Sequence, residues 1–97
     1  MSIFFMFGKY TKESAREISA ERTKRAVEVI NRLGGEVKSM YSLLGEHDLI
    51  FIVDLPDMKN ALKVSVALNQ LTGINFSTSP VVNVDEFDKM INELKEM

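Results

Sequence analysis

A small group of side chains in this sequence could do chemistry or hold a ligand, and most of them stand next to predicted turns. They are Lys9, Tyr10, Tyr41, Gly45, His47 and Asp48. His47 is the only histidine of the chain, and an imidazole can serve as a general base or as a haem ligand. The chain has no second histidine, and the sequence identifies no carboxylate paired with His47 to orient it. We therefore predict no catalytic residue and interpret His47 as a ligand contact or a solvated turn residue.

The same turn begins at Gly45 and ends at Asp48. Glycine favours a backbone with positive φ, so we predict that conformation at Gly45. Asp48 either accepts N–H bonds within the turn, the commoner role of a turn aspartate, or binds a ligand amine. Lys9 and Tyr10 follow the first predicted strand and Tyr41 lies in the second, so these side chains could join the turn in lining a cavity. The alternative for Tyr41 is a structural role, because a buried hydroxyl needs a partner.

Composition narrows the classes of function. The chain has no cysteine and one histidine, so we predict no metal site and no cofactor. A net charge of -2 argues against binding to nucleic acid. A basic cluster of Arg22, Lys24, Arg25 and Arg32 is mixed with glutamates at helical spacing, which predicts a solvated helix face. Apolar runs are short and no basic leader precedes the first strand, so we expect no membrane segment and a cytoplasmic location.

Hydrophobic patterning predicts a single domain over residues 1–97. The predicted strands are Ile3–Phe7, Glu36–Leu44, Leu49–Leu55 and Ile74–Val82. The predicted helices are Glu21–Leu33, a helix capped by Asp57 and stopped by Gly73, and Asp85–Glu96. The segment Thr11–Ala20 is either a loop or a first helical turn. Pro80 places the last strand at a sheet edge or at a bulge, because proline cannot donate to a ladder.

This order of elements is typical of an α+β, ferredoxin-like βαββαβ fold with an extra C-terminal helix. Such a fold has one four-stranded antiparallel sheet with helices on one face. Simple alternation along the second strand predicts that Val37 and Tyr41 point to one face and Met40 to the other.

The first and third strands, which this fold makes central, carry large apolar side chains on both faces. In the first strand Ile3, Phe5 and Phe7 share one face, and Phe4 and Met6 share the other. Left exposed, the uncovered face would form an apolar patch on the order of several hundred Å². Either the final helix folds back over it or a second copy packs sheet to sheet. We favour a homodimer or larger oligomer, because a short helix covers only part of the sheet and a small domain gains most from extra burial.

Two segments resemble a known family. Gly45–Val53 resembles the signature of the GYD-domain family, small uncharacterised proteins with a dimeric α/β-barrel fold, and Phe7–Thr11 and Gly34-Gly35 fit the same family. The resemblance implies a dimeric α/β-barrel assembly. The family usually has tyrosine where this chain has His47, so any function of that ring is in question here.

The second half of the chain is also similar to the RAM effector-binding domain of leucine-responsive regulators. The matching features are Gly45 and Asp48 in the turn, the Gly73-Ile74 step, and the Thr78-Ser79 pair. This resemblance implies pairing through the sheets, with ligands at subunit contacts near the turn. Those regulators carry a DNA-binding helix-turn-helix ahead of the domain. We see none here, so such a role would need a separate partner.

These observations leave different classes of function open. The first is a non-enzymatic homo-oligomer that binds a small amphipathic or anionic metabolite near the Gly45–Asp48 turn. The second is a small barrel enzyme, such as a cofactor-free monooxygenase or a muconolactone-isomerase-like protein, that uses His47, Tyr10 or Tyr41. Haem binding is a variant of the second, and a purely structural partner of another protein is a third. We favour the first, because no convincing catalytic group is present.

Overall fold

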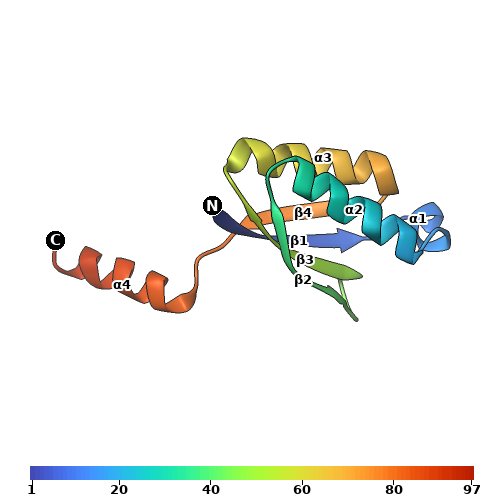
Figure 1. The fold of residues 1–97 in the computed structure, drawn as a ribbon. Helices are drawn as coiled ribbons and strands as arrows, with labels where there is room; N and C mark the ends of the chain where they lie inside the picture. The colour runs from blue at the N-terminus through green and yellow to red at the C-terminus, as the bar shows by residue number, and fades with distance from the viewer.

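The computed structural model describes residues 1–97 and has the predicted α+β, ferredoxin-like arrangement (Figure 1). The strands are β1 (Ser2–Lys9), β2 (Glu36–Ser42), β3 (Leu49–Leu55) and β4 (Asn75–Pro80). The helices are α1 (Lys12–Arg16), α2 (Ala20–Arg32), α3 (Met58–Thr72) and α4 (Val84–Lys95). Most bounds agree with the sequence-based prediction to within one or two residues.

The strands form one antiparallel sheet in the order β2-β3-β1-β4, so β1 and β3 are central as predicted. β4 is an edge strand, which confirms the first of the alternatives for Pro80. Pro80 is the last residue of β4 and lies opposite Phe4. An edge position tolerates a residue that lacks the backbone N–H.

Helices α2 and α3 cover one face of the sheet and create the core. The most deeply buried side chains on this face include Met6, Val53 and Leu55 from the sheet, and Ile30 and Leu68 from the helices. Each helix begins at a residue whose side chain accepts an N–H bond, Ser19 for α2 and Asp57 for α3. Such caps satisfy backbone donors that the first helical turn leaves free.

The segment Thr11–Ala20, left open by the sequence, contains the short helix α1. The Thr11 hydroxyl accepts from the Ser14 N–H at 3.1 Å, and the Ser14 hydroxyl accepts from the Thr11 N–H at 2.7 Å. This reciprocal pair is a capping box. It fixes the direction of the chain as it leaves β1 beside Tyr10.

The simple alternation predicted for β2 is wrong. A register shift between Val37 and Ser39 marks a bulge, which changes the phase of the strand. Val37 and Met40 both pack against the core under the helices, whereas Tyr41 is on the opposite face. The bulge therefore adds Tyr41 to the face that no helix covers.

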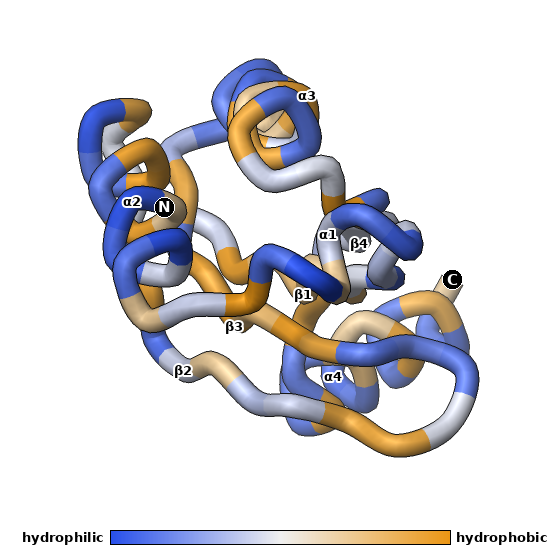
Figure 2. Tube along the Cα trace, turned by 90° about the vertical axis from the view of Figure 1, so that its right-hand side faces the viewer, coloured by the Kyte–Doolittle hydropathy of each residue, from blue (hydrophilic) through white to orange (hydrophobic).

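Helix α4 projects away from the body of the molecule (Figure 1). It has no buried residue and no substantial packing contact with another element. The radius of gyration is 15.2 Å, against about 12.5 Å expected for a compact chain of this length. In Figure 1 α4 extends past the end of the sheet where β1 begins, and in Figure 2 it lies on the side of the sheet away from α2 and α3. None of the helices combines the length and the apolar character that crossing a bilayer requires.

Candidate functional site

The sheet face that α2 and α3 do not cover, called the open face below, is largely apolar. The register places Phe5 beside Ile52, and Phe7 between Ile50 and Ser77. The open face comprises Ile3, Phe5, Phe7, Glu36, Ser39, Tyr41, Ile50, Ile52, Asp54, Ser77 and Ser79. Its apolar members are partly or well shielded by one another, and the Phe5 and Phe7 rings meet edge to face at 6.3 Å. The polar members are concentrated on the outer strands.

At one end of the open face, the Gly45–Asp48 turn brings several of the predicted site residues together. Gly45 has φ of 111°, as predicted for this turn. The Lys9 ammonium donates to the Glu46 carbonyl at 2.8 Å. The His47 ring packs on the Phe7 ring with centroids 4.9 Å apart. A cation and an imidazole thus border the apolar surface at the same end.

Asp48 has a structural role that ties this turn to β1. Its carboxylate accepts from the Tyr10 N–H at 2.8 Å, and its own N–H donates to the Gly8 carbonyl at 2.9 Å. Its carbonyl accepts from the Leu43 N–H at 2.8 Å. These bonds fix the turn against the end of β1, and the carboxylate accepts from the Tyr10 N–H outside the turn, where the sequence analysis expected a donor within it.

The two tyrosines predicted for the site lie on opposite faces of the sheet. Tyr41 is exposed on the open face, opposite Ile50. Tyr10 packs against the core on the helical side, where the Arg22 guanidinium lies 6.0 Å from its ring centroid. The structure therefore gathers Lys9, Tyr41 and His47 on one side and separates Tyr10 from them.

The prediction that Arg22 belongs to a solvated face is wrong. Arg22 is 7% exposed, and its guanidinium donates to the Ser14 carbonyl. It lines a small cavity of about 40 Å³ together with Phe51 and Phe76. The charge pattern of α2 could not reveal this, because the carbonyl and the ring that hold Arg22 come from the segment before the helix.

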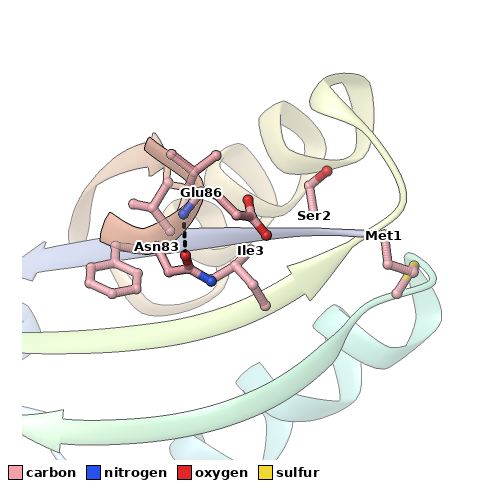
Figure 3. A pocket seen from close by; sticks show the side chains of 8 residues that line it. Met1, Ser2, Ile3, Asn83 and Glu86 are labelled. Atoms are coloured by element: carbon pink, nitrogen blue, oxygen red, sulfur yellow. Dashed lines mark hydrogen bonds between the residues drawn. The ribbon is translucent and has the colours of Figure 1, made fainter. Parts of the chain in front are cut away.

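The structure also shows features at the other end of the open face that the sequence analysis missed. A cavity of about 530 Å³ lies where β1 begins and α4 leaves the sheet (Figure 3). Ile3 and Phe5 contribute apolar walls, and Asn83 and Glu86 contribute the helix end. The Asn83 side chain accepts from the Glu86 N–H at 2.8 Å, so it serves as the cap of α4.

Asp54 is the other feature missed. One of its carboxylate oxygens, Oδ1, is buried and has no hydrogen-bond partner within the chain. Asp54 lies on the open face beside Ile3 and Glu36. A buried acceptor without a donor is costly.

The side chains at the turn offer a cation and an imidazole as polar groups. His47 packs on a phenyl ring, and the one ion pair of the chain joins Lys38 to Glu36. No carboxylate is paired with the imidazole to orient it as a base. No three His, Cys, Asp or Glu side chains are grouped so that they could hold a metal ion. Lys9, with a carbonyl as its hydrogen-bond partner, remains a cation able to bind an anion.

Comparison with solved structures supports the fold. The leucine response regulatory protein LrpA of Mycobacterium tuberculosis has a TM-score of 0.57 and 13% identity, over 86% of this chain and 51% of its own. The structure of a glutamate-to-alanine mutant has a TM-score of 0.56 with the same identity and coverage. This chain thus spans about half the length of each of these structures. No curated protein matches the sequence.

The comparison with family models is more specific. The model of the GYD domain matches residues 4–91, which include β1 from Phe4 onward, the other three strands and the Gly45–Asp48 turn. The match includes both segments whose resemblance the sequence suggested, the Gly45–Val53 run and the end of β1. The chain therefore belongs to the GYD domain family.

Proposed function

We propose that this protein is a homodimeric binding module in which two copies pair through their open faces. A small anionic metabolite binds between them, at the end of the sheet near the Gly45–Asp48 turn. The observation that carries the proposal is the open face itself: a largely apolar sheet surface with Lys9 and His47 at one end.

Pairing of the open faces follows from the energetics of the surface. Full burial of a large apolar side chain contributes about 1.5–3 kcal/mol. Apart from Tyr41, those of the open face are already partly or fully buried in the single chain, so pairing adds a fraction of this value for each residue, counted twice in a symmetric dimer. Helix α4 does not cover the face in the structure. The resemblance of the Gly45–Asp48 turn and the Gly73-Ile74 step to the RAM effector-binding domain, which implies pairing through the sheets, also supports self-association.

The ligand chemistry follows from the side chains at the turn. Lys9 offers an ammonium without a carboxylate partner, which suits a carboxylate or phosphate group. The Phe7 and Tyr41 side chains offer apolar and aromatic surface in the same row of the sheet. A small anion with an apolar or planar body fits both the Lys9 ammonium and this aromatic surface. His47 would lie at the edge of such a ligand. The mode of action is binding, without a chemical step.

The proposal is tested by thermal unfolding of the full chain with a panel of small carboxylates and phosphate esters. A ligand at about 100 times its Kd adds about 2.7 kcal/mol to the free energy of unfolding, a shift of several degrees in Tm. Lys9→Met should weaken a binding ligand about 10- to 100-fold, because a charge-assisted hydrogen bond is lost.

The matched control is Lys59→Met, because Lys59 is also exposed but begins α3 at the other end of the sheet. It should leave the affinity unchanged. If no member of the panel raises Tm, or if the two variants weaken binding equally, the proposed site is wrong.

A further inference from the structure

Helix α4 has an apolar stripe that nothing in its own chain covers. The stripe consists of Val84, Phe87, Met90, Ile91 and Leu94, at the spacing of a single helix face. Phe87 and Leu94 are 50% and 61% exposed. An isolated helix of 12 residues is only marginally stable in water. The stripe and the length of α4 both imply a packing partner outside the chain's own body.

We propose that α4 is an arm that crosses to the second copy and packs its apolar stripe against that copy. The inference rests on the proposed dimer and assigns α4 a role within it. Because α4 lies on the side of the sheet where the open face is uncovered (Figure 2), a second copy on that face comes within reach of the arm.

A stable dimer needs a larger contact area than the open face alone provides, which supports this role for α4. Four strands at about 4.8 Å and seven residues at about 3.3 Å give an open face of about 440 Å². A stable interface buries about 800 Å² on each partner. A helix of this length is about 18 Å long and 10 Å wide, so its stripe covers about 180 Å². Each copy gives one arm and receives another, so the arm contacts nearly double the footprint that the open face alone contributes.

Charge argues against a lipid surface as the alternative occupant. Beyond Asn83 the chain has five acidic residues and two lysines. The acidic residues are Asp85, Glu86, Asp88, Glu93 and Glu96, and the lysines are Lys89 and Lys95. Helices that lie on membranes usually have a basic polar face, which attracts anionic lipids. The acidic face of α4 would be repelled instead.

Hydrogen exchange measured on the full chain tests the arm. Above the concentration at which the dimer dissociates, amides of α4 should be protected. In the monomeric variant Ile52→Glu, which removes an apolar contact from the open face, that protection should fall at least about 100-fold. Protection that persists in the monomer would mean that α4 folds onto its own body, and the arm would be refuted while the dimer stands.

Substitutions within α4 give a second test. Phe87→Glu lies in the stripe and should raise the dissociation constant of the dimer about 100-fold, because each of two symmetric contacts contributes about tenfold. Asn92→Glu is the matched control: it adds the same charge on the polar face and should leave the constant within about threefold. If the two variants had equal dissociation constants, or if the α4 amides exchanged freely in an intact dimer, the proposed arm would be refuted while the dimer would stand. A wild-type protein that is monomeric at every concentration would overturn the arm and the proposed dimer together.

Discussion

Replacing Ile52 with glutamate should convert the protein to monomers without unfolding it. Ile52 lies at the centre of the open face, on β3 between Phe5 and Ser39. It is half-buried in the single chain, so a glutamate there can still reach water in a monomer. In the proposed dimer the same carboxylate would be trapped against the apolar face of the other copy.

The size of the effect follows from this placement. Full burial of an isoleucine contributes about 1.5–3 kcal/mol; at most about a third of Ile52 remains to be buried, which contributes up to about 1 kcal/mol in each copy. Both copies lose it, which gives up to about 2 kcal/mol. Desolvation of two carboxylates adds several kcal/mol more. A total of at least about 4 kcal/mol corresponds to a dissociation constant raised about 1000-fold.

Sedimentation velocity over a range of concentrations measures this constant, and circular dichroism confirms that the variant is folded. The matched control is Val66→Glu, because Val66 is another β-branched residue but is exposed on α3, on the helical side. The control should associate like the wild type. A dissociation constant for Ile52→Glu within about threefold of the wild-type value would refute pairing through the open face. Equal disruption by Val66→Glu would point to an interface on the helices.

Other predictions concern the stability of the single chain and are tested by urea unfolding. Gly35→Ala should destabilise the fold by about 1–3 kcal/mol, because a Cβ there would lie 2.5 Å from a Leu55 methyl group. Asp48→Ala should cost about 1–3 kcal/mol by leaving the Tyr10 N–H unpaired, and Asp48→Asn should recover most of it; equal losses would contradict the assigned bond. Arg22→Met should cost about 1–3 kcal/mol through the lost hydrogen bond and ring contact, and an unchanged midpoint would refute that role.

The sequence predicted the central strands well because their apolar residues are unambiguous. The double-faced pattern of Ile3 to Phe7 and of Leu49 to Leu55 is a local property, and it identified β1 and β3 as the pair with an uncovered surface. The turn at Gly45 was also predictable, because a positive φ at glycine depends on the residue type.

The predictions that failed have a common cause. The features they concern depend on contacts with other segments of the chain or on irregular backbone geometry. A bulge after Val37 changed the face of Tyr41, and alternation alone cannot locate an extra residue. Arg22 is buried because Tyr10 and Ser14 reach it from the preceding segment. Periodicity identified the apolar stripe of α4, but it specifies a face and not the surface that the face contacts.

The central claim is that two copies pair through the open face, and the solution mass tests it most directly. Light scattering on the purified protein across a dilution series should give twice the mass of a single chain, falling toward the single-chain mass only on strong dilution. A mass equal to one chain at every concentration would contradict the account, because the open face, the intersubunit ligand site and the α4 arm all depend on the second copy.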